Sequence, residues 1–193
     1  MAKVFLLPIE TTSRELDYKI FISCLLAEKG SEVFIGSKSK IFYFLNCFES
    51  FTYLDKGFHF ANSENIFNQL KKKKAVILSL DEEGAIDFSD GSALNKRYSS
   101  GLFDEVNKVY FWGKTQFKKY GERSIDPKQS LITGHPRFQI LKAEYRDIFK
   151  DRSDLLKQKY GKFILVNTNT SFGNHIKGDK FVSDNYRNRF SKI

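Results

Sequence analysis

The feature that most constrains the fold is an alternation of short apolar runs with longer amphipathic segments. Runs typical of strands covered on both faces occur at 3–9, 32–37, 57–61, 75–80, 108–113, 130–134 and 162–169. Helical patterns lie between most of them, at 11–30, 40–48, 63–74, 115–121 and 136–150. This βαβα order predicts an α/β fold with a mainly parallel, doubly wound sheet.

The first predicted helix and the cysteines give expectations about burial. In the helix at 11–30, one stripe carries four residues that we expect to be buried: Leu16, Ile20, Cys24 and Ala27. Cys24 and Cys47 fall within predicted helices and lack the spacing of a metal site, so we expect buried, free thiols. No apolar run approaches the roughly 18 residues of a membrane helix. The polar turn at Glu10 favours a first strand over a signal peptide, which predicts a cytoplasmic protein.

The charge is uneven along the chain. Residues 1–106 carry 13 Lys and Arg against 15 Asp and Glu, a net charge of −2, and residues 107–193 carry 19 against 8, a net charge of +11. A basic half indicates an anionic partner such as a nucleotide or a membrane surface, and a merely soluble Lys-rich surface is the alternative. The sequence contains no recognisable nucleic-acid-binding module, so we expect no nucleic acid partner.

Polar clusters follow several of the predicted strands. They comprise Glu10 to Arg14, Gly36 and Ser37, Asp81 to Gly84, Gly134 and His135, and Asn167 to Asn174. Parallel sheets of this type bind ligands beyond the carboxyl ends of their strands. We therefore expect these clusters to share one edge of the sheet and to contain the functional residues.

Three adjacent carboxylates, Asp81, Glu82 and Glu83, form either a solvated turn or a catalytic site. A carboxylate can deprotonate an acceptor hydroxyl or stabilise a cationic sugar centre. Crowding of carboxylates raises their proton affinity, which suits a base near neutral pH. His135 and Arg137 could stabilise a departing phosphate, at a helix that Pro136 opens.

Three stretches together resemble bacterial surface carbohydrate biosynthesis proteins. They are LPIETTSRELDYKIFISCLLAEKGSEVFIGS near the start, DEEG at 81–84, and VYFWGKTQF…ITGHPRFQIL…YGKFILVNTNTSFGNH. These proteins look like glycosyltransferases of the two-domain GT-B type, and the resemblance runs from residue 3 to about residue 175. The same acidic-acidic-Gly and His-Pro pair is found in bacterial sialyltransferases and Kdo transferases, which use CMP-activated 2-keto sugar acids.

The resemblance implies roles for particular residues. It gives the catalytic carboxylate position to Glu82, and a shift of one residue would move that role to Asp81 or Glu83. It implies that His135 contacts the CMP phosphate, and the expected nucleotide site comprises His135, Arg137, Gly134, Asn167 and Asn169. Glu10 and Arg14 are expected either to touch substrate or to form a helix-start ion pair. We expect no metal and no cofactor.

The resemblance also implies a domain arrangement. Residues 1–140 would form the Rossmann-like N-terminal domain of a GT-B enzyme, and residues 141–161 a helical linker. Residues 162–193 would begin an incomplete C-terminal nucleotide-binding domain, since no helix or strand is evident in the sequence after His175. We expect either a truncated enzyme or a small remnant of one, and the activity of this chain alone is in question.

The expected function is that of a glycosyltransferase in bacterial surface polysaccharide biosynthesis. It would transfer a 2-keto sugar acid from a CMP donor to a glycan or glycolipid acceptor, with peripheral contact to an anionic inner membrane as a further possibility. Two alternatives stay open. One is a GT-B transferase or epimerase with another nucleotide donor, and the other is a non-catalytic basic binding domain.

Overall fold

The structure is a computed structural model that describes residues 3–59, 62–83, 90–166 and 177–190. The chain divides into two compact units, Met1–Ile148 and Phe149–Ile193. The strands of the first unit are β1 (Val4–Ile9), β2 (Glu32–Ser37), β3 (Thr52–Asp55), β4 (Val76–Leu80), β5 (Lys108–Phe111) and β6 (Ser130–Ile132). Its α-helices are α1 (Thr12–Glu28), α2 (Lys38–Tyr43), α3 (Asn62–Lys72), α4 (Ser92–Arg97), α5 (Ser100–Glu105), α6 (Lys114–Tyr120) and α7 (Pro136–Gln139). Short 3-10 turns are η1 (Leu45–Cys47) and η2 (Gly121–Arg123), and η3 (Ala143–Phe149) follows α7.

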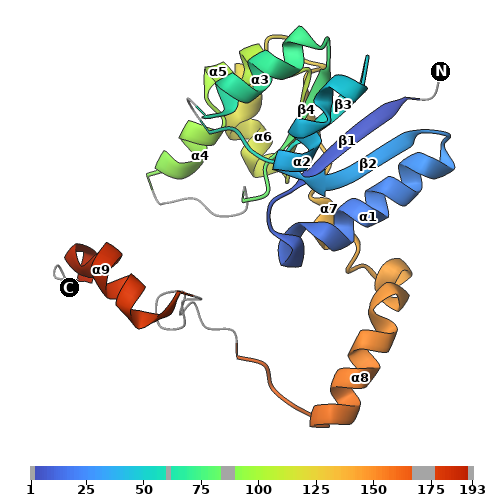
Figure 1. The fold of residues 1–193 in the computed structure, drawn as a ribbon, viewed down its shortest axis with the longest axis vertical. Coiled ribbons are helices and arrows are strands. Elements are labelled where there is room, and N and C mark those ends of the chain that lie inside the picture. The colour runs from blue at the N-terminus through green and yellow to red at the C-terminus, as the bar shows by residue number, and fades with distance from the viewer. Residues whose placement is uncertain (1–2, 60–61, 84–89, 167–176, 191–193) are drawn as a thin grey trace. The chain divides into compact units, whose positions relative to one another are not determined.

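The six strands form one sheet in the order β2-β1-β3-β4-β5-β6, and every neighbouring pair is parallel. Helices flank this sheet, as Figure 1 shows. The prediction of an α/β fold with a parallel sheet is confirmed, and the architecture is Rossmann-like.

The strand order explains how the helices distribute over the two faces. The chain moves from β1 outward to β2, then returns past β1 and continues in the opposite direction to β6. Because parallel crossovers are right-handed, α1 lies on one face and the crossover helices after β2 lie on the other. In Figure 1, α1 and α7 accordingly lie on one side of the sheet, with α3 and α5 on the opposite side.

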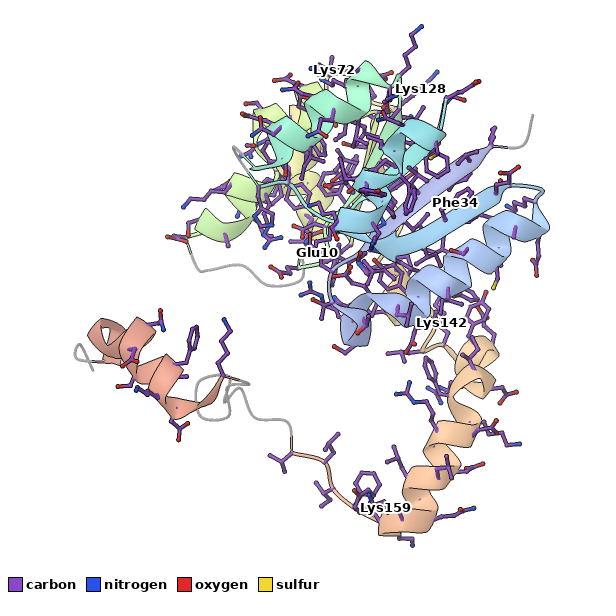
Figure 2. All side chains as sticks on the ribbon, viewed as in Figure 1. Glu10, Phe34, Lys72, Lys128, Lys142 and Lys159 are labelled. Carbon is purple, nitrogen blue, oxygen red and sulfur yellow. The ribbon has the colours of Figure 1, made fainter. Side chains whose placement is uncertain are left out.

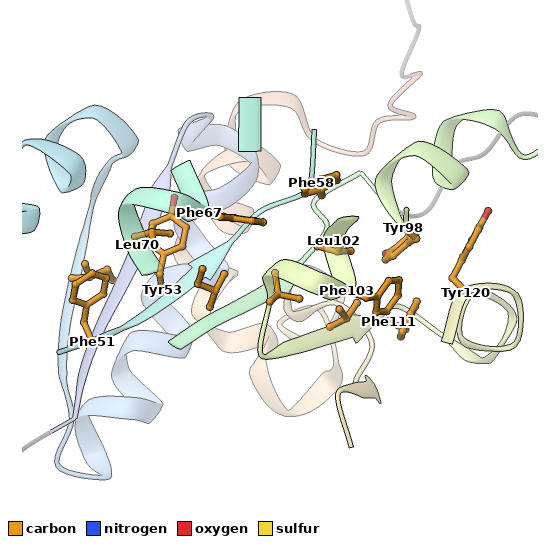
Figure 3. Close-up of a cluster of buried hydrophobic side chains, with 14 of the residues drawn as sticks. Phe51, Tyr53, Phe58, Phe67, Leu70, Tyr98, Leu102, Phe103, Phe111 and Tyr120 are labelled. Atoms are coloured by element: carbon orange, nitrogen blue, oxygen red, sulfur yellow. The ribbon is translucent and has the colours of Figure 1, made fainter. Parts of the chain in front are cut away.

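The main core lies between the sheet and the helices of the α3 and α5 face (Figure 3). Alternate strand residues point to this face, since successive side chains of a strand alternate between faces. Buried members from the strands include Leu6, Tyr53, Ile77, Val109 and Phe111, and those from α3 and α5 include Phe67, Leu70, Leu102 and Phe103.

The third strand lies earlier than predicted. Residues 57–59 of the predicted strand at 57–61 are not in a strand, and residues 60 and 61 lie outside the described residues. β3 occupies Thr52–Asp55 instead, and it pairs with both β1 and β4. The segment FTYL has the aromatic and β-branched residues that favour strands, whereas Gly57 has a φ of 142°, which interrupts an extended run. This shift brings Asp55 and Lys56 to the carboxyl edge of the sheet.

Two expectations about burial are wrong. Cys24 and Cys47 are free, as expected, but both are exposed. The stripe predicted to face the core is at most partly buried, and Ile20 is 45% exposed. The buried residues of α1 are Glu15, Tyr18 and Lys19. The helix therefore buries charged groups near its start, where Lys19 contacts both Glu15 and Glu82.

In the part of the second unit that the structure describes, the helices are α8 (Lys150–Tyr160) and α9 (Gly178–Phe190). The predicted strand at 162–169 is not formed in its described part, since none of residues 162–166 is in a strand. Their apolar side chains are exposed. The prediction of no helix after His175 is also wrong, because α9 forms there. The sequence did not reveal this helix because its residues are mostly polar and give only a weak amphipathic pattern. Among the described residues, no helix is long and apolar enough to cross a membrane.

Candidate active site

The predicted polar clusters that the structure describes meet at the carboxyl edge of the sheet. β1 and β3 are neighbours, but the chain leaves them toward opposite faces, and ligands of such sheets bind at this kind of switch point. Glu10 follows β1 and is labelled at this edge in Figure 2. Its Oε2 lies 2.7 Å from Nζ of Lys56, which follows β3. The backbone N–H of Glu82, after β4, donates to the carbonyl of Lys56 at 2.9 Å.

Glu82 lies at the centre of this arrangement and is only 2% exposed. Its Oε1 accepts a hydrogen bond from the hydroxyl of Tyr18 and lies 3.6 Å from Nζ of Lys19. Its Oε2 lies 3.4 Å from Nε2 of His135, although the two atoms are not aligned as a hydrogen bond. Burial raises the pKa of Glu82, and the contact with His135 opposes that rise.

His135 connects α7 to the carboxylate. Its Nδ1 accepts the backbone N–H of Arg137 at 3.1 Å, which caps the first turn of α7. Since Nδ1 accepts, a neutral imidazole carries its proton on Nε2, the nitrogen that faces Glu82. Gly134 precedes it with a φ of 72°, a conformation that glycine adopts without strain. The imidazole is thus buried beside Glu82, and its contact with a phosphate stays a prediction.

Two further side chains hold the backbone of the acidic turn, residues 81–83. Arg137 donates from Nη2 to the carbonyl of Glu82 at 2.9 Å. Trp112, just after β5, donates from Nε1 to the carbonyl of Asp81 at 2.6 Å. The guanidinium of Arg137 also lies 5.6 Å from the centre of the Trp112 ring. The turn is therefore fixed from both β5 and α7.

Asp81 and Glu83 lie on either side of Glu82 and differ in exposure. Asp81 is buried, and Arg97 donates to its Oδ1 at 2.7 Å. Burial raises the pKa of Asp81 despite the opposing charge of Arg97. The Glu83 side chain is 50% exposed and contacts Arg97 and, at 3.0 Å, Arg14. Partial burial would raise the pKa of Glu83, but the two arginines outweigh it and lower the pKa. A solvated turn is therefore excluded for Asp81 and Glu82, which are buried.

Glu10 and Arg14, the predicted substrate residues, both lie at the site but contact different partners. Glu10 pairs with Lys38 at 3.2 Å as well as with Lys56. Arg14 reaches Glu83 and also lies 3.3 Å from Glu15. Both side chains are partly exposed, so both remain accessible to a ligand.

The sequence reasoning missed a second layer of charged residues beneath this surface. These residues are Glu15, Lys19, Asp55, Lys56 and Arg97, together with Tyr18. The sequence does carry a signal for Glu15 and Lys19, because these residues have the i, i+4 spacing of a helical ion pair. No local pattern marks Arg97, whose partners Asp81 and Glu83 are brought to it by the fold.

The remaining predicted site residues, Asn167 and Asn169, lie outside the described residues, as does Gly84. Within the described residues, no cluster of His, Cys, Asp or Glu has the arrangement of a metal site. No protein-family model matches this chain, and a search of curated proteins finds no match.

Proposed function

We propose that this protein is a glycosyltransferase of bacterial surface polysaccharide biosynthesis, acting in the cytoplasm. The observation that carries the proposal is the contact between Glu82 and His135 at 3.4 Å. The two residues belong to the acidic-acidic-Gly and His-Pro motifs of the sequence resemblance. Both lie at the carboxyl edge of a parallel sheet, where such folds bind ligands.

The proposed reaction transfers a 2-keto sugar acid from a CMP donor to a glycan or glycolipid acceptor. The acceptor oxygen forms a bond to the anomeric carbon, and the bond from that carbon to the phosphate oxygen breaks. A carboxylate of the acidic turn takes the proton of the acceptor hydroxyl, and CMP leaves with the electron pair. Arg14, Arg97 and Arg137 surround the turn and could stabilise the negative charge on the phosphate.

The two candidate bases, Glu82 and Glu83, differ both in exposure and in the direction of their pKa shifts. Glu82 has a raised pKa, which makes it a stronger base than an ordinary carboxylate, but it is buried. A substrate could reach it only if the turn moves when the ligand binds. Glu83 is half exposed, but its lowered pKa makes it a weaker base. We assign the base to Glu82 and the orientation of the acceptor to Glu83.

The test replaces each acid of the turn by its amide in protein produced from the complete natural reading frame. The variants are Asp81→Asn, Glu82→Gln and Glu83→Gln, and transfer from CMP-linked sugar acids is measured along with thermal stability. We expect Glu82→Gln to lose on the order of 10²-fold or more in turnover. Glu83→Gln should show the next largest loss. The ion pair of Lys71 and Glu105, which lies outside the site, offers a matched control in Glu105→Gln.

Three outcomes separate the alternatives. If Glu83→Gln shows the larger loss in folded protein, the base is Glu83 and the proposed function stands. If wild-type protein transfers only from donors with another nucleotide, the CMP assignment fails and the alternative GT-B transferase is supported. If all three variants keep wild-type transfer within about threefold, the catalytic role of the turn is refuted.

A further inference from the structure

A buried lysine, Lys19, lies beneath the proposed site, and the proposed reaction gives it no role. Lys19 of α1 is 1% exposed. Its Nζ contacts the carbonyl of Pro8 at the end of β1 and lies 3.2 Å from Oε2 of Glu15. The same Nζ lies 3.6 Å from Oε1 of Glu82. A buried ammonium is costly unless it is paired, so these contacts need a functional or structural reason.

The pairing with Glu15 does not by itself account for Lys19. Glu15 also accepts the backbone N–H groups of Glu10 at 3.1 Å and Thr11 at 3.2 Å. In addition, Nζ of Lys56 lies 3.4 Å from Oε1 of Glu15. The negative charge of Glu15 is therefore compensated at the start of α1 without Lys19.

Fewer lysine and arginine side chains contact Glu82 than contact Glu15. Among the described residues, Lys19 is the one lysine or arginine in ion-pair contact with the Glu82 carboxylate. The other groups that face Glu82 or its neighbours are Tyr18 and Glu15 from α1, His135 and Arg137 from α7, and Lys56 after β3. Arg137 contacts the carbonyl of Glu82 and not its carboxylate.

We propose that Lys19 is a positioning residue that keeps the carboxylate of Glu82 ionised and aimed at His135, with Glu15 holding Lys19 in place. This inference rests on the proposed function for its catalytic meaning, although the electrostatic coupling can be measured without it. Lys19 acts through Glu82 and does not touch the reacting atoms. The tether to Pro8 also fixes α1 to the end of β1, so the charge is presented at a defined place.

The coupling has a definite sign. An opposite charge within about 4 to 6 Å lowers the pKa of a carboxyl by roughly 1 to 3 units. Burial already raises the pKa of Glu82, so loss of the Lys19 charge should raise it further. In Lys19→Met we therefore expect the titration midpoint of Glu82 to move upward by about 1 pH unit or more. The acid limb of the pH–rate profile for transfer should move in the same direction.

The experiment titrates the 193-residue chain labelled with ¹³C at the glutamate carboxyl carbon. The Glu82 signal is assigned by its absence in Glu82→Gln, and its midpoint is compared between wild type and Lys19→Met. The matched control is Lys71→Met, which removes a lysine that pairs with Glu105 at 2.7 Å outside the site. The control should leave the Glu82 midpoint unchanged.

A second variant covers the case in which Lys19→Met does not fold. The double variant Glu15→Gln with Lys19→Met removes both charges of the buried pair and should leave a less costly neutral cluster. Its Glu82 midpoint should lie above that of the single variant Glu15→Gln, which is the matched reference because loss of the Glu15 charge lowers the pKa of Glu82 in both. The wild type offers a test without any variant, because ¹⁵N NMR must show Nζ of Lys19 as an ammonium over the pH range in which Glu82 titrates. A neutral amine there overturns the proposal.

The outcomes distinguish this inference from the proposed function. A Glu82 midpoint within about 0.3 unit of wild type in folded Lys19→Met, or within about 0.3 unit of Glu15→Gln in the double variant, refutes the positioning role, whatever the activity. A raised midpoint together with no transfer by the wild-type full reading frame supports the positioning role and removes the glycosyltransferase proposal. A raised midpoint and a matching shift in the pH–rate profile support both.

Discussion

Nε2 of His135 lies 3.4 Å from Oε2 of Glu82, although the two residues follow different strands and are far apart in the sequence. Glu82 follows β4 and His135 follows β6, with β5 between these strands in the sheet. The contact exists because Gly134 turns the chain back and α7 begins at Pro136. It joins two short motifs, each weak alone, into one buried acid–imidazole pair.

Asp55 should make the stability of the protein depend on pH. Burial raises its pKa to about 6 in the folded protein, from an ordinary value of 3.8. The folded state therefore binds this proton more tightly than the unfolded chain, and stability from this group falls as the pH rises from about 4 to about 6. Asp55→Asn should remove that loss and raise the free energy of unfolding at pH 7 by about 2 to 3 kcal/mol.

Urea unfolding of wild type and Asp55→Asn at pH 4 and pH 7 measures this difference. The increase in the free energy of unfolding caused by Asp55→Asn should be close to zero at pH 4 and largest at pH 7. Asp104→Asn, at an exposed position of α5, is the charge-matched control and should show no such pH-dependent gain. An equal effect of Asp55→Asn at both pH values would show that the ionised form of Asp55 carries no cost.

Gly57 should not tolerate a side chain. Its φ is 142°, and a Cβ there would lie 3.2 Å from Oδ1 of Asp81 and 3.4 Å from Nη1 of Arg97. Gly57→Ala should therefore both strain the backbone and disturb the Arg97–Asp81 ion pair, at a cost above about 1 kcal/mol in unfolding free energy. Gly113→Ala is the control, because a Cβ at Gly113 meets nothing within 4 Å. Equal stability of the two variants in thermal unfolding would contradict the packing described here.

Arg137 should contribute to nucleotide binding if the phosphate approaches α7. Arg137→Gln removes a charged donor, so CMP should bind about tenfold more weakly by calorimetry, the loss typical of a charge-assisted hydrogen bond. Arg146→Gln, at an exposed arginine of η3, should bind CMP as the wild type does. Unchanged binding by folded Arg137→Gln would exclude this arginine from the nucleotide site.

The cysteines should react readily in the native protein. Both Cys24 and Cys47 are free and exposed. A thiol reagent such as DTNB should therefore modify about two thiols without denaturant and at similar rates before and after unfolding. Modification that requires denaturant would restore the expectation of buried thiols.

The sequence by itself determined the class of fold and much of the candidate site. Short apolar runs separated by helical patterns suffice to predict a parallel sheet, because each strand must be covered on both faces. Parallel strands end at a common edge, so residues that follow different strands were expected near one another. This reasoning placed the clusters of Glu82 and His135 at one edge of the sheet, and in the structure the two side chains lie 3.4 Å apart there.

Only the tertiary structure decided which charged residues are buried and paired. The local pattern of α1 favoured the stripe containing Ile20 and Cys24, yet the helix buries Glu15 and Lys19. The reason is that burial of a charge depends on partners from other elements, here Pro8, Lys56 and the turn at Glu82. Such partners are distant in the sequence, and helical periodicity carries no information about them. The exposed Glu83 and the buried Glu82 are neighbours in the chain, and only the contacts of the folded chain separate their environments.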